Sequence, residues 1–160
     1  MYSRMGDGDG GGETVFQRVG EGLEGQGHEV TRVFANAELP PGARMEDRNK
    51  SFIGLSTPPS WQFFLRFNHA VDFVKSLLGL FCLLWRVQPD VVNYHYYSKG
   101  ALHFALLKRI FGYRFVVSCH GSDVVKMNAM HRQVAPLVFS KADGVTCVSQ
   151  ALSERLREKV

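Results

Sequence analysis

His120 is the residue whose type and position in this sequence are best suited to chemistry. It follows the apolar run VVSC and opens the segment His-Gly-Ser-Asp, which continues with Gly121, Ser122 and Asp123. An imidazole can hydrogen-bond a ligand hydroxyl and carry a proton near neutral pH. We therefore predict His120 as the catalytic residue and the next three residues as ligand contacts. A structural role for His120 and a capping role for Asp123 are the alternatives.

A second group of candidates is aromatic and ends another apolar run, VVNYHY. Tyr94, His95 and Tyr96 are predicted to contact ligand, because a tyrosine ring can stack on a flat ligand face while its hydroxyl hydrogen-bonds outward. For the two tyrosines, ordinary alternation of core and edge positions is the alternative. Ser149 ends a further apolar run, where it could contact ligand or cap the next helix.

The third candidate is the glycine-rich segment GDGDGGGE at residues 6–13, which precedes a predicted helix. Gly11, Gly12 and Glu13 are the predicted contacts, since free N–H groups at a helix amino end favour an anion such as phosphate. A flexible terminus is the alternative. The segment does not fit a calcium loop, because the twelfth position counted from Asp7 is Arg18 rather than the required glutamate.

Helices and strands are predicted to alternate along the chain. The predicted strands cover residues 28–35, 91–96, 114–119 and 144–148, and the predicted helices cover residues 14–26, 61–87, 98–111, 130–141 and 150–159, with a loop at residues 36–60. Helical periodicity predicts an apolar stripe in the first helix, made of Val15, Phe16, Val19 and Leu23, and another in the 98–111 helix, made of Leu102, Leu106 and Ile110. The 61–87 helix could break at Gly79. Nearly continuous apolar strands between helices indicate an α/β fold, a doubly wound Rossmann-like parallel sheet with helices on both faces. Its ligands would lie at the carboxyl ends of the strands.

One strand of that fold is not found in the sequence. The strand order normally begins before the glycine loop, and that first strand lies in the middle of the sheet. Residues 1–5, MYSRM, are too few and too polar to form it. We therefore expect the first strand to be missing and the sequence to be incomplete. A smaller sheet rearranged around the gap is the alternative.

Charge and cysteine usage narrow the functional class. The net charge of +4 suits a phosphate-bearing ligand or an anionic lipid surface but is too small to indicate nucleic acid. Cys82, Cys119 and Cys147 lie far apart in the sequence, each in an apolar run and without zinc-ligand spacing, which predicts a reducing cytoplasmic location. The most apolar stretch, residues 76–85, is too short to span a membrane. It is expected to be a buried helix, with peripheral contact at the inner membrane face left open.

Four segments together resemble the amino-terminal domain of family 4 of the retaining glycosyltransferases. They are the glycine loop with GQGHEVTRV at residues 25–33, PDVV leading to YHY at residues 89–96, VVSCHGSD at residues 116–123, and KADGVTCVSQALSERL at residues 141–156. Each segment alone is weakly specific. Their order and spacing, which extend from residue 10 to about residue 157, are much more specific.

The resemblance implies the GT-B architecture, in which two Rossmann-like domains face each other across a cleft. Such an enzyme moves a sugar from a UDP- or GDP-sugar donor to a hydroxyl of a glycan, lipid or small-molecule acceptor, with retention of anomeric configuration. The resemblance also implies that His120 contacts the sugar in the cleft and that Gly11 and Gly12 lie near the phosphates. No metal or cofactor is expected, because the positive amino ends of helices can take the phosphate charge.

The same resemblance assigns donor binding to a second domain with a Glu-x7-Glu pattern. The only downstream pair worth testing, Glu154 and Glu158, is spaced by four, which is ordinary helix-surface spacing. We therefore expect residues 1–160 to be a single partial domain on the acceptor side, with the carboxyl-terminal donor domain absent and the isolated fragment inactive.

Two other functional classes are alternatives to a transferase. A non-catalytic Rossmann-like domain that binds a ligand or regulates another protein is the main alternative. A hydride-transferring dinucleotide enzyme is disfavoured, because the glycines do not give G-x-G-x-x-G after a strand and no acidic residue ends the strand at Ala35.

Overall fold

Helices and strands alternate in the computed structural model, which describes residues 11–35, 39–47, 50–55 and 67–160. In chain order these elements are α1 (Gly11–Gly25), β1 (Arg32–Ala35), β2 (Arg44–Asp47), β3 (Lys50–Ile53), α2 (Phe67–Val87), β4 (Val91–His95), α3 (Ala101–Phe111), β5 (Arg114–Cys119), α4 (Ser122–Val125), α5 (Ala129–Phe139), β6 (Gly144–Cys147) and α6 (Gln150–Arg157). The predicted α/β class is confirmed.

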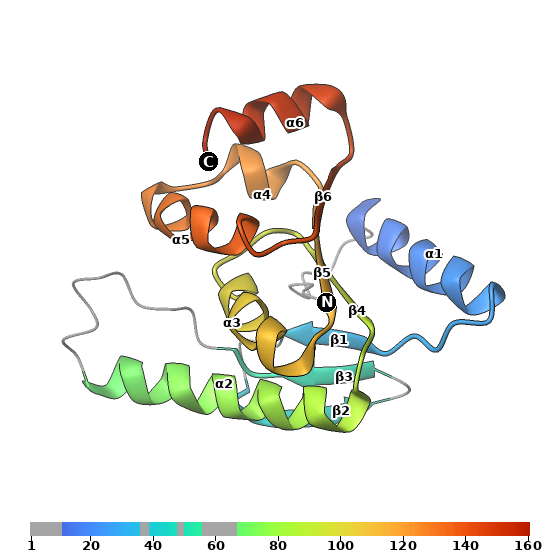
Figure 1. Ribbon diagram of the computed structural model, residues 1–160, viewed down its shortest axis with the longest axis vertical. Helices are drawn as coiled ribbons and strands as arrows, with labels where there is room; N and C mark the ends of the chain where they lie inside the picture. The colour runs from blue at the N-terminus through green and yellow to red at the C-terminus, as the bar shows by residue number, and fades with distance from the viewer. Residues whose placement is uncertain (1–10, 36–38, 48–49, 56–66) are drawn as a thin grey trace.

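The sheet formed by β4, β5 and β6 is the centre of the fold. Its order is β4-β5-β6, and both pairings are parallel. In Figure 1, α1 lies to one side of this sheet, and α3 and α5 lie to the other. Phe115 and Val117 of β5 are fully buried, and Tyr94, Phe104 and Val138 belong to the same core. These strands and their flanking helices confirm the predicted parallel sheet.

A second, smaller sheet corrects the prediction of a loop at residues 36–60. β3 pairs in parallel with β1 and antiparallel with β2, in the order β1-β3-β2. The sequence obscured these strands because each has four residues and β2, Arg-Met-Glu-Asp, is a polar strand with no apolar alternation. β3 buries Phe52 and Ile53, while the described side chains of β2 are exposed.

The described strands therefore form two sheets instead of the single sheet that was predicted. Within the described residues β1 pairs only with β3, and β4 pairs only with β5. The predicted absence of a first, central strand stays a prediction, because residues 1–10 lie outside the described residues.

Helix α1 begins at Gly11, earlier than predicted, and ends as the glycine signal indicated. Gly27 has φ of 87°, its N–H donates to the carbonyl of Glu24, and the N–H of His28 donates to the carbonyl of Leu23. This is the Schellman arrangement of a helix end. The predicted apolar stripe is mostly wrong, because only Phe16 of its four members is buried; Val15, Val19 and Leu23 are exposed.

Two more helical predictions need correction. Helix α2 continues through Gly79 without a break, and Gly79 is there because the backbone of Gly42 packs directly against it. Helix α3 ends at Gly112 as predicted, but Leu106 and Ile110 are exposed while His103, Phe104 and Leu107 face the core. Periodicity found the helices correctly, but most of the side chains that it assigned to the core are exposed; Phe16 and Leu102 are the members that pack inward.

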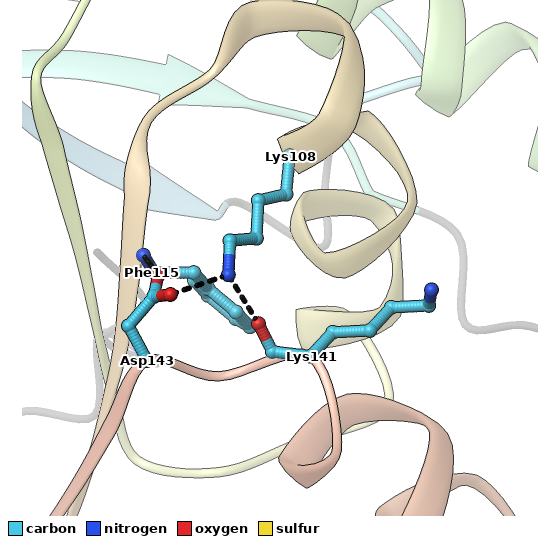
Figure 2. A network of polar contacts seen from close by, with 4 residues as sticks. All are labelled: Lys108, Phe115, Lys141 and Asp143. Atoms are coloured by element: carbon cyan, nitrogen blue, oxygen red, sulfur yellow. Dashed lines mark hydrogen bonds and ion pairs between the residues drawn. The ribbon is translucent and has the colours of Figure 1, made fainter.

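The amino ends of β5 and β6 are joined by a polar network, which Figure 2 shows. The Nζ of Lys108 donates to Oδ1 of Asp143 at 2.7 Å and to the carbonyl of Lys141 at 2.8 Å. The other carboxylate oxygen of Asp143 accepts from the N–H of Phe115 at 2.7 Å. These hydrogen bonds from Lys108 and Phe115 lower the pKa of Asp143. The network thus ties α3 to the start of both strands.

The cysteines are less separated in space than in sequence. Cys119 and Cys147 are register partners on β5 and β6, and both are free thiols. Burial raises the pKa of the Cys119 thiol, so it is a poor nucleophile. Cys82 is exposed on α2, which corrects the expectation that all three act as buried apolar side chains.

Candidate functional site

Strand register brings His95 and His120 together at the carboxyl edge of the β4-β5-β6 sheet. His95 ends β4 and is the partner of Ser118, so the two side chains point to the same face. His120 is two residues beyond Ser118 and returns to that face. The Nδ1 of His95 lies 3.0 Å from Nε2 of His120, and the ring centroids are 5.2 Å apart. Two predicted site residues are therefore in direct contact.

Tyr96 completes an aromatic stack over His120. Its ring lies 4.2 Å from the His120 ring, with an angle of 24° between the ring planes. The backbone of Tyr96 has φ of 60°, a left-handed conformation that is unusual for a bulky residue. The N–H of Tyr96 still pairs with the carbonyl of Ser118 at 2.9 Å. This turn of the chain directs the Tyr96 ring onto His120.

The two imidazoles are uncharged near neutral pH. Burial and, to a smaller extent, the nearby His120 together lower the pKa of His95 to about 4. Burial also lowers the pKa of His120, while the Asp123 carboxylate acts in the opposite direction. His95 is only 4% exposed, whereas His120 is half-buried. A neutral, partly accessible imidazole can give or accept one hydrogen bond with a ligand hydroxyl.

Asp123 organises the loop that carries His120. One carboxylate oxygen accepts from the N–H of Gly121 at 2.8 Å and of His120 at 3.1 Å. The other accepts from the N–H of Tyr97 at 2.8 Å. Gly121 has φ of 123°, which favours glycine at this turn. The predicted capping role of Asp123 is wrong, because the N-cap of α4 is Gly121 and no side chain caps that helix. The carboxylate instead binds backbone N–H groups of two loops.

The remaining predicted residues occupy different positions. Tyr94 is 1% exposed, its hydroxyl lies 2.6 Å from Oγ of Ser98, and its ring packs against Phe104, so it belongs to the core. Ser122 is exposed and begins α4. Ser149 is the N-cap of α6, where its side chain accepts from the N–H of Leu152, which confirms the capping alternative.

Gly11, Gly12 and Glu13 form the first turn of α1 instead of a loop before it. The Phe16 ring, about one turn further on, contacts both Phe34 of β1 at 5.6 Å and His95 of β4 at 5.4 Å. The first half of α1 therefore lies at the carboxyl ends of β1 and β4, on the side of the sheet that carries the histidine pair. The side chain of Glu13 lies outside the described residues.

Sequence reasoning missed a row of polar side chains below the histidines. The hydroxyl of Ser118 donates to Oδ1 of Asn93 at 2.8 Å and accepts from the hydroxyl of Thr146 at 2.9 Å. These residues alternate with apolar ones along their strands, so a count by twos from His95 and His120 would have placed them on the same face. The short helix α4 was also missed.

Neither a metal cluster nor a membrane-spanning helix is found in the part of the chain that the structure describes. No group of three or more His, Cys, Asp or Glu residues there could hold a metal ion. Among those residues, no helix is both long and apolar enough to cross a membrane.

A family model described as "Glycosyl transferase 4-like domain" matches residues 10–160, which include every predicted site residue. A search of curated proteins found no match.

Proposed function

Because this chain belongs to the glycosyl transferase 4-like domain family, we propose that it is the acceptor-side domain of a retaining glycosyltransferase. The observation that carries the proposal is the neutral, partly accessible imidazole of His120, which lies at the carboxyl edge of the parallel sheet between Tyr96 and His95. This is the edge at which α/β sheets bind ligands. Membership of the family supports a glycosyltransferase-type function for the whole domain.

The proposed reaction transfers a sugar from a UDP- or GDP-sugar to an acceptor hydroxyl. The bond between the anomeric carbon and the donor phosphate oxygen breaks, and a bond from the acceptor oxygen to that carbon forms on the same face. The acceptor proton leaves with the nucleoside diphosphate. His120 hydrogen-bonds a hydroxyl of the sugar, Tyr96 supplies an apolar ring face beside it, and the amino end of α1 at Gly11 and Gly12 faces the phosphates.

Donor recognition is the second part of the proposal. A second Rossmann-like domain, which carries the Glu-x7-Glu pattern in the GT-B architecture, would hold the nucleotide across the cleft. We propose a cytoplasmic enzyme that needs no metal or cofactor. Its acceptor is a sugar or a lipid, in the second case with peripheral contact at the inner membrane face.

The test uses the full reading frame that encodes this chain. The expressed protein is incubated with radiolabelled UDP-glucose, UDP-N-acetylglucosamine or GDP-mannose and with sugar and lipid acceptors, and the product anomer is read by NMR. His120→Ala should lower kcat/KM by about 100-fold, as is typical for the loss of one hydrogen bond made to the transition state, with the circular dichroism unchanged. His28→Ala, at an exposed site, should leave turnover unchanged.

Other outcomes of this experiment would contradict parts of the proposed function. Unchanged turnover in His120→Ala would remove His120 from the site, and an inverted anomer would exclude a retaining mechanism. Absence of transfer together with sugar or nucleotide binding by the 160-residue chain would favour a non-catalytic ligand-binding domain.

A further inference from the structure

The contact between His95 and His120 couples the tautomers of the two rings. Nδ1 of His95 and Nε2 of His120 are 3.0 Å apart, a hydrogen-bond distance that requires one N–H and one lone pair. Both rings are neutral near pH 7, because burial lowers both pKa values. Each ring therefore carries a single proton, and the tautomer of one ring determines the tautomer of the other.

The surroundings of His95 favour one of the two arrangements. Its ring is 4% exposed and meets the Phe16 ring edge-on, and its Nε2 makes no hydrogen bond to a described residue. Nε2 of His95 is not among the fully buried described atoms without a partner, but in a ring that is only 4% exposed an N–H without an acceptor is rarer than a lone pair without a donor. The buried His103 follows this pattern: its Nδ1 lies 3.1 Å from the carbonyl of Gly100, and its Nε2 has no partner. The His95 proton is thus best placed on Nδ1.

We propose that His95 is a positioning residue whose Nδ1–H donates to Nε2 of His120 and thereby holds His120 in the Nδ1–H tautomer, with that N–H directed to the ligand. The inference rests on the proposed function, because it makes His120 a hydrogen-bond donor to an oxygen of the bound sugar. Among the described residues Nδ1 of His120 has no hydrogen-bond partner, so it is the ring nitrogen left for ligand. The stacked Tyr96 ring limits rotation of the imidazole.

Substitutions of His95 can be chosen that either keep or remove the hydrogen-bond donor to His120. The side-chain amide of asparagine can occupy the place of Nδ1, whereas the amide of glutamine extends toward the place of Nε2. His95→Asn should therefore keep the donor to His120, and His95→Gln and His95→Leu should lose it. Long-range ¹H–¹⁵N spectra of the ¹⁵N-histidine-labelled 160-residue chain report the tautomer of each neutral ring without any need for activity. His28→Gln is the control, since that side chain is exposed.

We expect His120 to be in the Nδ1–H tautomer in the unsubstituted chain and in His95→Asn, and to show a mixture of tautomers in His95→Leu and His95→Gln. In the full reading frame, His95→Leu should lower kcat/KM by about 10- to 100-fold, as is typical for a residue that orients another, and His95→Asn should restore most of it. Adding His95→Leu to His120→Ala should cause no further loss, because His95 acts through His120.

Two results would overturn the proposal. One is a proton on Nε2 of His120 in the unsubstituted chain, and the other is an unchanged His120 tautomer in His95→Leu. Absence of transfer with the expected tautomers would instead refute the proposed function and leave the His95–His120 arrangement established.

Discussion

The carboxylate of Asp123 lies 2.8 Å from the backbone nitrogen of Tyr97 and accepts its hydrogen bond. The same carboxylate accepts from the N–H groups of His120 and Gly121. One side chain in α4 therefore joins the loop that follows β4 to the loop that follows β5. Because His95 and Tyr96 precede the first loop and His120 begins the second, Asp123 fixes the distance across which the stacked rings meet.

Removal of the Asp123 carboxylate should loosen this edge of the sheet. Asp123→Ala leaves three backbone N–H groups without their acceptor, so we expect the free energy of unfolding to fall by on the order of 2 kcal/mol. Asp123→Asn retains a single acceptor oxygen and cannot serve both loops, so its loss should be smaller. Urea unfolding measures both variants, and Asp90→Ala, an exposed aspartate, is the control. Equal stabilities for all of them would show that the loops do not depend on Asp123.

The sequence was sufficient to predict the parts of this fold that repeat a simple pattern. Continuous apolar runs predicted β4, β5 and β6, and Gly27 and Gly112 predicted where α1 and α3 end. His120 and its neighbours were predicted as ligand contacts because such contacts collect at strand ends in a parallel sheet, and the structure places His120 directly after β5. These features depend on the local amino-acid sequence, so they can be predicted without knowing which distant segments come into contact.

The parts that failed depend on contacts between distant segments. In the sequence Gly79 suggests a helix break. The structure shows instead that the backbone of Gly42, which is far away in sequence, packs against it. The polar strand β2 gives no local signal, because pairing with β3 is what makes it a strand. The contact between His95 and His120 needs the register of β4 against β5, and one residue of slip would place the rings on opposite faces.

Two glycines in helices should respond to alanine in opposite ways. A Cβ at Gly79 would collide with the backbone of Gly42, which cannot move as a flexible side chain could, so Gly79→Ala should destabilise by about 1–3 kcal/mol. A Cβ at Gly22 in α1 would meet nothing within 4 Å, so Gly22→Ala should stabilise by about 0.5–1 kcal/mol through backbone entropy. Thermal and urea unfolding of the two variants provide the comparison. A stabilising Gly79→Ala would contradict the close packing of α2 on Gly42.

The network in Figure 2 should couple Lys108 to Asp143. Lys108→Met and Asp143→Asn should each destabilise, and the double variant should lose less than the sum, because both remove the same contact. Asp143→Asn should be the more damaging, since its carboxylate also accepts from the N–H of Phe115.

A double-mutant cycle on the ion pair between Arg86 and Glu46, whose side chains are 66% and 58% exposed, serves as the control. It should show little coupling, because solvent and salt screen exposed ion pairs. Strictly additive losses at Lys108 and Asp143, measured by urea unfolding, would show that their contact does not stabilise the fold.

His103 should make the protein less stable as the pH falls. Its side chain is 0% exposed and packs against Phe73, and burial lowers its pKa to about 4. The unfolded histidine has a pKa of about 6.5, so the unfolded chain binds the proton first as the pH decreases. The stability contributed by the neutral ring is complete above pH 6.5 and is lost as the pH falls toward about 4, by on the order of 3 kcal/mol. His95, with a pKa of about 4, acts in the same direction.

His103→Phe tests this pH dependence because phenylalanine fills a similar space and cannot titrate. The variant gives up the hydrogen bond from Nδ1 to the carbonyl of Gly100, but it also removes the buried Nε2 that has no partner. We therefore expect its stability at pH 7.5 to lie within about 1 kcal/mol of the unsubstituted chain. Its loss of stability between pH 6.5 and pH 4.5, measured by urea unfolding, should be clearly smaller, with the remainder due to His95 and other groups. An equally steep loss in both proteins would mean that His103 takes up its proton in the folded chain as readily as in the unfolded one.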